Sequence, residues 1–297
     1  MEIYMLRSFL AVAEARSFSG AARVVHSSQS TLSRQIARLE SELGVQLFER
    51  YGRHVECTAT GELLLPLVQA IVTRIDEVTS LARERVGSDS STVRFGAVPN
   101  VLAVLLAPIL VSFLATHPNV SVHLLEMDDA QLEDAVASGE LDCAVMTPWG
   151  SARVATQRLA TEEILLVVPR GHHLAGHPAI TFSMLADESI LLPRPTMNMG
   201  NIVVNAMRRA GFEPRSSYRA NYPELIKALV RKGVGVATMP KLLVAPDSME
   251  GLLAIPFKDA LFRELCLAYP RDRRLPAGTQ MLMRYVKARV SERGGIV

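Results

Sequence analysis

Residues 28–44, SQSTLSRQIARLESELG, have the pattern of an amphipathic helix with a defined start and end. Ser28 is a typical N-cap residue and Gly44 a typical C-cap residue, so we expect a helix from Gln29 to about Leu43. Its apolar residues recur at helical spacing and predict one buried stripe, formed by Leu32, Ile36, Leu39 and Leu43. The opposite face carries polar and basic side chains, namely Gln29, Ser30, Ser33, Arg34 and Arg38.

Two interpretations of this polar face are open when the helix is taken alone. It could be an ordinary solvated surface, or it could bind DNA. Gln and Arg can bond base edges in a major groove, and Ser and Arg also hold phosphates. The flanking sequence favours DNA binding, because short amphipathic segments precede the helix and a hairpin pattern follows it.

The segments around the helix predict a small domain. The first has an apolar helical face formed by Leu6, Phe9, Leu10 and Ala13. The second is a short helix that Ser17 or Ser19 can cap. Two short strands, residues 45–50 and 54–58, flank a turn that contains Arg53. Residues 1–59 are therefore predicted to form a winged helix-turn-helix domain.

Residues 60–86 predict one long helix. At ~1.5 Å per residue it would be about 40 Å long. Its apolar residues step by three or four, close to a coiled-coil seam, and they are Leu64, Leu67, Ile71, Ile75, Val78 and Ala82. A polar hinge follows, so residues 60–91 are expected to be a linker helix and hinge.

From residue 92 to residue 297, predicted strands and helices alternate. This order is typical of mainly parallel α/β sheets with helices on both faces. The expected strands are 92–98, 120–127, 143–146, 164–169, 190–192, 234–237 and 264–269, with a connector at 147–163. The expected helices are 101–116, 130–138, 201–210, 223–232 and 278–290. A late return of the chain predicts two lobes around a cleft, lobe I from 92–163 and 266–297 and lobe II from 164–265.

Composition limits the class of protein. The chain has 297 residues, of which 49% are hydrophobic and 21% charged, as in a globular protein of about two domains. Its net charge is only +2, so DNA binding must come from a local patch. No leader pattern is found, and the apolar run 101–115 is shorter than a membrane span. We therefore expect a cytoplasmic protein with no membrane contact.

Several segments resemble the LysR-type transcriptional regulators in order and spacing, over nearly the whole chain. They include residues 8–22, 28–40, 43–50 and 58–61, and, further on, 142–145, 166–172, 209–212 and 233–237. The resemblance implies a winged helix-turn-helix, a dimerising linker helix, and a two-lobed effector domain like periplasmic binding proteins. It also implies an operator DNA, a homodimer or homotetramer, a small-molecule effector, and RNA polymerase as a possible partner.

The resemblance assigns roles to single residues of the first domain. Gln29, Ser33 and Arg34 match the family's DNA-contact positions, and Arg53 matches its wing contact. Ser30 departs from the pattern, since proline is usual there. A serine adds a hydroxyl and a backbone N–H, so contacts at this position can differ.

The expected effector site follows from a general property of α/β sheets, in which ligands bind at the carboxyl ends of strands. Three such places are visible, at residues 98–101, 147–148 and 195–198. The resemblance puts the family's inducer site at these places, with Asn221 and Tyr222 lining lobe II. The candidate residues are Pro99, Asn100, Val101, Thr147, Thr196, Met197, Asn198, Asn221 and Tyr222.

Asp128 is a further candidate for the effector site. A carboxylate near the cleft would repel an acidic effector, which suggests a polar effector with a hydroxyl or an amine. The alternative is that Asp128 only caps the following helix.

Other chemistries are less favoured. Cys143 and Cys266 could sense redox state if they were close, but their apolar neighbours favour inert core thiols. His172, His173 and His177 more often belong to a solvated turn, so we expect no metal and no cofactor besides the unknown effector. Catalytic motifs are missing, which argues against an α/β enzyme. A solute-binding protein would leave the first 90 residues unexplained.

Overall fold

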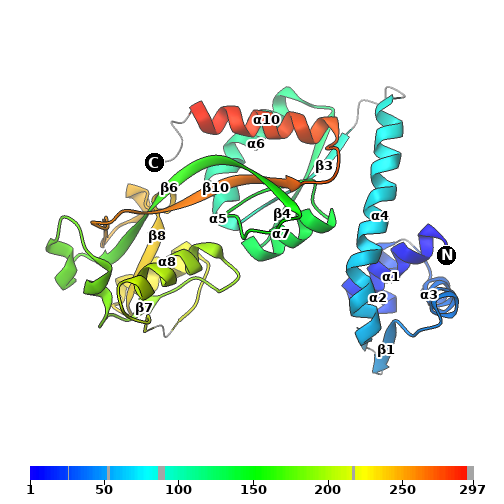
Figure 1. Ribbon diagram of the computed structural model, residues 1–297, viewed down its shortest axis with the longest axis horizontal. Coiled ribbons are helices and arrows are strands. Elements are labelled where there is room, and N and C mark those ends of the chain that lie inside the picture. Colours follow the sequence, from blue (N-terminus) through cyan, green and yellow to red (C-terminus); the bar gives the residue numbers. More distant parts are fainter. Residues whose placement is uncertain (26, 52–53, 86–90, 216–217, 293–297) are drawn as a thin grey trace. The chain divides into compact units, whose positions relative to one another are not determined.

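The computed structural model describes residues 1–25, 27–51, 54–85, 91–215 and 218–292. The chain forms two compact units (Figure 1). One contains Met1–Ser88 and Ser138–Glu140, and the other contains Asp89–Ala137 and Leu141–Val297. Each unit has a hydrophobic core of its own.

The first unit consists of three short helices, a hairpin and a long helix. In chain order they are α1 (Ile3–Ala15), α2 (Phe18–Val24), α3 (Gln29–Leu43), β1 (Phe48–Tyr51), β2 (His54–Cys57) and α4 (Ala59–Arg85). The bounds predicted for α3 are confirmed. The Ser28 hydroxyl accepts the backbone N–H of Thr31 at 3.1 Å, and Gly44 ends the helix with a φ of 71°.

The core of the first unit lies between these helices and the hairpin. Its centre is formed by Met5, Phe9, Leu32, Ile36 and Leu39, all at most 1% exposed. The predicted stripe of α3 is correct except for Leu43, which is 39% exposed because the helix ends there. On α1 the buried face is Met5, Leu6, Phe9 and Val12, while Leu10 and Ala13 are only partly buried.

The hairpin is fastened to α3 by one carboxylate. Glu40 accepts the backbone N–H groups of Leu47 at 2.8 Å and Phe48 at 3.3 Å. Gly61, at the start of α4, lies so close to the hairpin that a Cβ would collide with the carbonyl oxygen of Leu47. The wing therefore has a fixed position relative to α3 within this unit.

Helix α4 has two different apolar faces. Val68 and Val72 are buried in the core of the first unit. A second stripe is exposed, with Leu63 at 74%, Leu67 at 59%, Ile71 at 41% and Val78 at 68%. Of the predicted seam, Leu67, Ile71 and Val78 thus face outward, whereas Leu64 packs against the core. The side chain of Ala82 lies outside the described residues.

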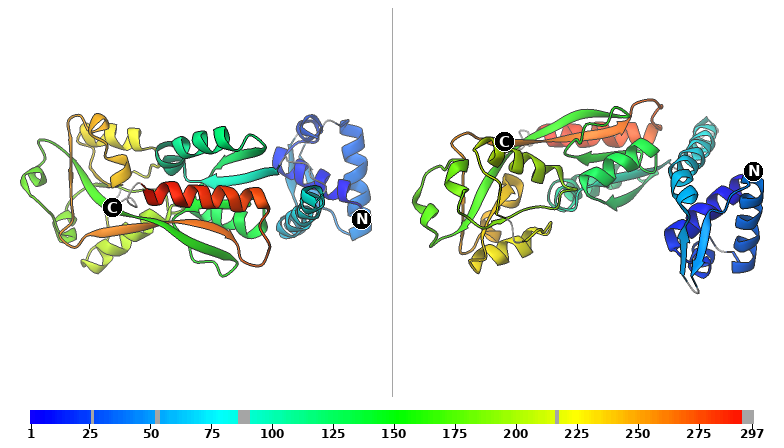
Figure 2. Two further views of the ribbon diagram at one scale, coloured as in Figure 1. Left: turned by 90° about the horizontal axis from the view of Figure 1, so that it is seen from above. Right: turned by 60° about the horizontal axis from the view of Figure 1, so that its bottom comes forward.

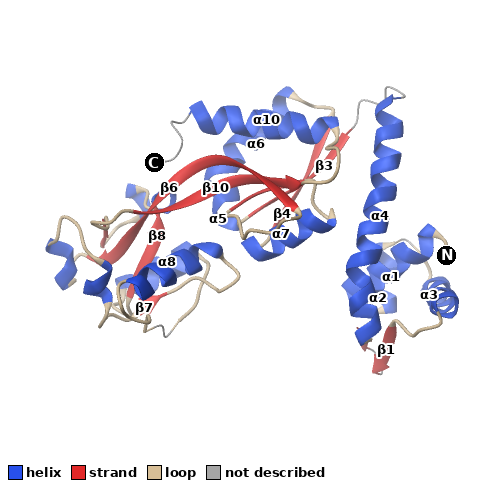
Figure 3. Ribbon diagram, viewed as in Figure 1, coloured by secondary structure: helices blue, strands red, loops and turns tan. Residues whose placement is uncertain are grey.

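The second unit is built on one eight-stranded sheet with the order β4-β3-β5-β10-β6-β8-β7, and β9 pairs with β6. Figure 3 shows its strands in red. The strands are β3 (Ser91–Ala97), β4 (Val120–Glu126), β5 (Cys143–Met146), β6 (Val154–Pro169), β7 (Ile190–Leu191), β8 (Val236–Pro240), β9 (Leu252–Ile255) and β10 (Leu261–Pro270). Strands β4, β3 and β5 are parallel in lobe I, and β7 and β8 are parallel in lobe II.

The centre of the sheet differs from the prediction. Strands β6 and β10 are long, antiparallel to each other, and run side by side from one lobe to the other (Figures 1 and 2). Residues 154–163 were predicted to belong to a connector, but they form the first part of β6. The prediction of mainly parallel pairing is also wrong for β6 and β10, which are antiparallel. The first half of β6 mixes apolar and polar residues without regular alternation, so hydrophobic pattern alone did not reveal it. Strand β9 was also missed.

Helices cover both faces of this sheet. They are α5 (Pro99–Val101), the π-turn Leu102–Leu106, α6 (Ala107–Thr116), α7 (Asp129–Ser138), α8 (Asn198–Arg209), α9 (Pro223–Arg231) and α10 (Ala277–Glu292), with short 3-10 turns at His173–Gly176, Phe182–Leu185, Lys241–Leu243 and Pro246–Ser248. In lobe II, α8 packs on the β6 face that contains Leu166 and Val168, and α9 packs on the face that contains Val167. Both helices begin near the boundary between the lobes.

The segment Pro99–Thr116 is continuous over 18 residues with a mean hydropathy of 2.0. By length and composition it could cross a membrane, a test that core helices of globular proteins also pass. Here Val101, Leu105 and Phe113 are at most 1% exposed in the lobe I core. The π-turn precedes Pro108, which has no N–H for an ordinary helical hydrogen bond.

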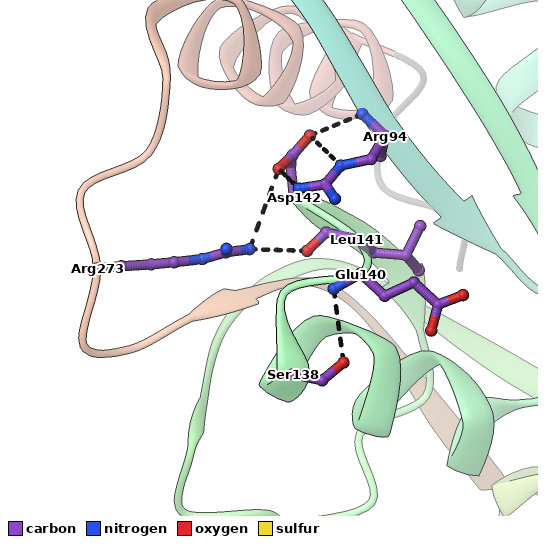
Figure 4. A network of polar contacts seen from close by, with 6 residues as sticks. All are labelled: Arg94, Ser138, Glu140, Leu141, Asp142 and Arg273. Carbon is purple, nitrogen blue, oxygen red and sulfur yellow. Dashed lines mark hydrogen bonds and ion pairs between the residues drawn. The ribbon is translucent and has the colours of Figure 1, made fainter. Parts of the chain in front are cut away.

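One buried carboxylate holds the edge of lobe I together (Figure 4). Asp142 accepts the backbone N–H of Arg94 at 2.8 Å and its guanidinium at 2.7 Å. Arg273, after β10, donates to the carbonyl of Leu141 at 2.9 Å and lies 4.0 Å from the Asp142 carboxylate. Asp142 therefore joins β3, β5 and the segment that leads into α10.

Candidate functional site

The first candidate surface is the exposed face of α3. Gln29, Ser30, Arg34 and Arg38 are exposed there and Ser33 is partly exposed, on the side opposite the buried Leu32 and Ile36. Arg53 lies outside the described residues. The structure thus brings together five of the six residues predicted to contact DNA.

Local contacts orient several of these side chains. The Ser19 hydroxyl of α2 donates to the Gln29 side-chain carbonyl at 3.0 Å, which ties the first turn of α3 to the preceding helix. The Ser30 hydroxyl lies 2.9 Å from that of Ser28, and Arg34 Nε contacts the Ser30 carbonyl at 3.4 Å. These weak or solvent-exposed contacts leave the polar groups accessible to a ligand.

Arg38 differs from Arg34 in its surroundings. Its guanidinium forms an ion pair with Glu42 of the same helix, with Nε 3.1 Å from the carboxylate. A phosphate would have to compete with this carboxylate. We therefore expect Arg38 to contribute less to DNA affinity than Arg34.

The second candidate site is a pocket between the lobes of the second unit. Its empty volume is about 440 Å³, a figure that includes space open to solvent. Most of its walls are apolar. It is lined by Val98, Asn100, Pro193, Met197, Met199, Ala220, Asn221, Pro223, Ile226, Thr238, Met239, Pro240, Leu243 and Arg263.

Two buried polar side chains line this pocket from strands β8 and β10. Thr238 and Arg263 are each 3% exposed. Arg263 forms an ion pair with the fully buried Glu162, with Nε at 2.8 Å and an amino nitrogen at 2.7 Å from one carboxylate oxygen. The other Glu162 oxygen accepts the backbone N–H of Leu242 at 2.6 Å. Glu162 is therefore fixed and compensates the charge of Arg263.

Polar side chains also bridge the lobes. Asp128 accepts the Thr196 hydroxyl at 2.5 Å and the Asn221 side-chain amide at 3.2 Å. The Asn100 side-chain amide donates to the Asn221 carbonyl at 3.4 Å. The Asp128 carboxylate thus reaches across to lobe II, and its backbone N–H bonds the Gln131 side chain at the start of α7.

Asp129 lies behind this bridge and is 1% exposed. Its carboxylate accepts the backbone N–H of Thr147 in lobe I at 2.9 Å and that of Asn198 in lobe II at 2.8 Å. Burial raises the pKa of Asp129 to about 6, although both hydrogen bonds and the nearby Arg263 act in the opposite direction. Asp129 therefore joins the two lobes through a carboxyl group that is costly to ionise.

The predicted effector residues have different positions. Asn100, Met197 and Asn221 line the pocket. Asp128, Thr196 and Asn198 bridge the lobes beside it, and Thr147 is buried behind Asp129. The remaining three do not line the pocket: Val101 lies in the lobe I core, Tyr222 is 71% exposed, and Pro99 begins α5.

The sequence prediction missed much of the pocket, including Met199, Thr238, Met239, Leu243 and Arg263. Thr238 and Met239 lie near the carboxyl end of β8, where the rule for α/β sheets could have found them. Arg263 gave no such signal, because it comes from the antiparallel strand β10.

A cluster of two histidines and a glutamate lies outside the pocket. Nε2 of His172 and of His173 are 3.5 and 3.1 Å from the Glu188 carboxylate. Nδ1 of His172 accepts the N–H of Leu174, which places the proton of a neutral ring on Nε2. Both imidazoles contact the Glu188 carboxylate, and the three side chains offer ligand atoms that lie within 4.8 Å of one another.

The cysteines do not form a redox pair. Cys266 is paired in register with Met146, three positions along β5 from Cys143, so the two thiols lie about 10 Å apart along the strand and on opposite faces. A disulfide needs Cα atoms within about 7 Å. Burial raises the pKa of both thiols, that of Cys266 to about 11. The expectation of inert core thiols fits this geometry.

Comparison with known proteins finds matches over both units. A probable hydrogen peroxide-inducible genes activator of Mycobacterium avium is 32% identical over 252 residues, which are 84% of this chain and 81% of that protein. The HTH-type transcriptional regulator BenM of Acinetobacter baylyi is 31% identical over 245 residues, 81% of this chain and 80% of that protein. The structure of a full-length OxyR variant from Pseudomonas aeruginosa superposes with a TM-score of 0.73 at 25% identity, covering 97% of this chain and 98% of that one.

Family descriptions match the two units separately. Residues 3–62 match the bacterial regulatory helix-turn-helix proteins of the lysR family. Residues 87–291, more than half of the chain, match the LysR substrate binding domain. The fold and the resemblance noted in the sequence are thereby confirmed, and the chain belongs to the LysR family of bacterial DNA-binding transcriptional regulators.

Proposed function

We propose that this regulator binds a dyad-symmetric operator as a dimer, through α3 and the wing, and that a small molecule in the pocket between its lobes controls that binding. The observation that carries the DNA part is the exposed polar face of α3, which α1 and α2 support from behind. Helices supported in this way enter major grooves in other helix-turn-helix proteins. The relatives are transcriptional regulators, so no enzymatic activity is proposed.

The residues of α3 have different proposed roles. Gln29 is the side chain best suited to base edges, and Arg34, Ser30 and Ser33 are suited to phosphates. Arg38 supports binding at longer range because Glu42 partly neutralises it. Arg53 is proposed to contact DNA from the wing, on the basis of the sequence alone.

The exposed stripe of α4 supports dimer formation. Leu63, Leu67, Ile71 and Val78 recur at helical spacing and are each more than 40% exposed. A second copy of the same stripe would bury these side chains, as in a coiled-coil seam. The proposal is a homodimer through α4. A tetramer and contacts with RNA polymerase are further expectations from the family resemblance, as is a cytoplasmic location.

Effector control follows if the ligand prefers one arrangement of the lobes. The pocket is lined by Asn100 from lobe I and by Asn221 and Thr238 from lobe II, so a bound molecule contacts both. Such a ligand shifts the population toward the arrangement it binds better. We propose that this shift changes half-site spacing or DNA bending.

We propose no peroxide-sensing cysteine, although one relative is named as a probable hydrogen peroxide-inducible genes activator and one similar structure is an OxyR. The chain has three cysteines, Cys57, Cys143 and Cys266. Burial raises the pKa of all three thiols, which keeps them in the unreactive thiol form. Reactivity toward peroxide requires a thiolate that solvent can reach.

The proposed function is tested by selecting fragmented DNA from the source genome on the purified full-length protein and sequencing the retained fragments. We expect enrichment of a site with dyad symmetry. If no site is enriched at low salt, with or without small molecules from a cell extract, the first unit is not a functional DNA-binding domain and the proposal fails.

A further inference from the structure

We infer that Asp128, Thr196 and Asn221 form a latch, in which the Asp128 carboxylate of lobe I holds lobe II and so closes the pocket between the lobes. Release of this latch admits the effector. The inference rests on the proposed function, since it takes this pocket as the effector site. It adds the residues that control entry, whatever the chemical class of the effector.

The Asp128 carboxylate uses both of its oxygens across the boundary. One oxygen accepts the Thr196 hydroxyl at 2.5 Å, and the other accepts the Asn221 side-chain amide at 3.2 Å. A carboxylate that only capped its own helix would accept backbone N–H groups of α7. Because both oxygens bond to lobe II, the contacts of this side chain join the lobes.

Lobe II orients the two donors before they meet Asp128. The side-chain oxygen of Asn221 accepts the backbone N–H of Arg194 at 2.9 Å, which turns the NH₂ group of Asn221 toward the carboxylate. The carbonyl of Thr196 accepts the backbone N–H of Ala130 at 3.2 Å. The segment that begins at Arg194 is therefore held against the start of α7 by side-chain and backbone bonds together.

The strand order places the latch away from the strands that connect the lobes. Strands β6 and β10 lie in the middle of the order β4-β3-β5-β10-β6-β8-β7. Asp128 follows β4, at the lobe I end of this order, which at ~4.8 Å per strand is about 14 Å from β10. Thr196 follows β7, at the lobe II end. Bending of β6 and β10 would therefore separate Asp128 from its partners.

The pocket lies between the connecting strands and the latch. Its lining includes Arg263 of β10 on one side and Met197 and Asn221 on the other. The hydroxyl of Thr238 and an amino nitrogen of Arg263 are shielded from solvent in this arrangement. A ligand reaches this inner wall after the lobes have moved apart, and that movement breaks the bonds of Asp128.

The bonds of the latch can break reversibly. Thr196 is exposed and Asp128 is partly exposed, so water can replace their hydrogen bonds when the lobes separate. Opening also breaks the bond from the Asn198 backbone N–H to Asp129, which is 1% exposed. The exchange of that N–H with solvent therefore reports the opening.

Amide hydrogen exchange of the full-length protein measures how often the lobes separate. Asp128→Ala removes two bonds of the latch and should raise the exchange rate at Asn198 about tenfold, whereas Thr196→Val removes one and should raise it about threefold. Asn198 lies in lobe II, so its exchange does not report fraying of α7. The measurement is made at pH 8, where Asp129, whose pKa is about 6, is ionised in each protein.

Two matched variants control for the substitutions themselves. Thr196→Ser retains the hydroxyl that Thr196→Val removes, and it should exchange like the wild type. Asp134→Ala removes an exposed carboxylate from the same helix as Asp129, and it should also exchange like the wild type.

Access to the pocket is measured with a thiol at its wall. Met239 lines the pocket and is 1% exposed. The thiol introduced by Met239→Cys should react with methyl methanethiosulfonate about tenfold faster when it is combined with Asp128→Ala than when it is alone. Cys143, which is fully buried in the lobe I core, is the reference in the same sample, and its rate should not change.

The inference is overturned if Asp128→Ala exchanges at Asn198 and reacts at the pocket thiol like the protein that keeps Asp128. An equal rise in Thr196→Ser or Asp134→Ala would also overturn it. If Asp128→Ala does not fold, the comparison of Thr196→Val with Thr196→Ser at the exposed Thr196 decides the matter. None of these measurements involves DNA, so a failure of the latch is distinguishable from a failure of the proposed function.

Discussion

Asp129 shows how one buried side chain can couple the lobes to pH. Its pKa is raised to about 6 from an ordinary 3.8, chiefly by burial. The folded chain therefore holds the proton more tightly than the unfolded chain. The resulting stabilisation is fully present below about pH 4 and is lost as the pH rises through about 6.

Denaturant unfolding of wild type and Asp129→Asn across this pH range checks the expectation. The stability of the wild type relative to the variant should fall by about 3 kcal/mol as Asp129 ionises, because each pKa unit corresponds to about 1.4 kcal/mol. The asparagine cannot ionise and serves as the reference. A difference that does not change with pH would show that Asp129 ionises normally in the folded protein.

Asp142 gives a second prediction for a single side chain. Asp142→Ala leaves Arg94 and Arg273 without their shared carboxylate and should lower the free energy of unfolding by about 3 kcal/mol. Glu264→Ala is the matched control, because Glu264 pairs with Arg158 at 3.7 Å and both side chains are more than half exposed. That change should cost less than about 1 kcal/mol. Equal losses in urea unfolding would contradict the assignment of Asp142 as a buried brace.

The sequence named some of the residues that line the pocket and missed others. Asn100, Met197 and Asn221 were found because they follow strands or precede helices, where ligands usually bind. Arg263 and Glu162 were not, because the register between β6 and β10 brings residues about 100 positions apart into contact. No local pattern records such a pairing. The sequence named Asp128 as a candidate for the effector site, but its link to Thr196 and Asn221 requires the tertiary structure.

Helix α3 makes a specific prediction about DNA binding. Arg34→Ala should weaken operator binding and reduce the slope of log affinity against log salt by about 0.9, because one phosphate contact is lost. Arg34 is exposed and its Nε contacts the Ser30 carbonyl of its own helix, so thermal stability should not change. Arg209→Ala in α8 removes the same charge from the other unit and is the control. An unchanged salt slope for Arg34→Ala would contradict a phosphate contact.

Helix α4 makes a prediction about assembly. Leu67→Glu places a charge in the exposed stripe, so it should shift the dimer toward monomer in analytical ultracentrifugation. Gln69→Glu introduces the same side chain two positions further along, about 200° around the helix from Leu67, and should leave the dimer intact. If Leu67→Glu sediments like the wild type, the stripe is not the dimer seam.

The elements differ in how well their sequences reveal them. Helix α3 was predicted with correct ends because Ser28 and Gly44 mark them and its apolar spacing is regular. Strand β6 was half missed, since the part before Ile164 has a mixed polar pattern and is held in the sheet by pairing with β10. Long-range pairing rather than local preference sets that strand.

The protein as a whole is proposed to combine two activities: reading DNA with α3 and binding a small molecule between the lobes of the second unit. Each activity can be lost without the other. A chain that only bound DNA would not respond to small molecules, and a chain that only bound ligand would select no operator. The central claim is that one molecule does both and that the ligand changes the DNA contact.

The most direct test is to measure the affinity and the footprint of the full-length protein on its selected operator, with and without the small-molecule fraction of a cell extract. The comparison uses wild type, Ala220→Phe, which fills the pocket, and Ala210→Phe, which adds the same ring at an exposed position. All three should bind the operator, and the fraction should change the affinity or footprint of wild type and Ala210→Phe but not of Ala220→Phe. An identical response in all three proteins, or no response in the wild type, would contradict control through the pocket.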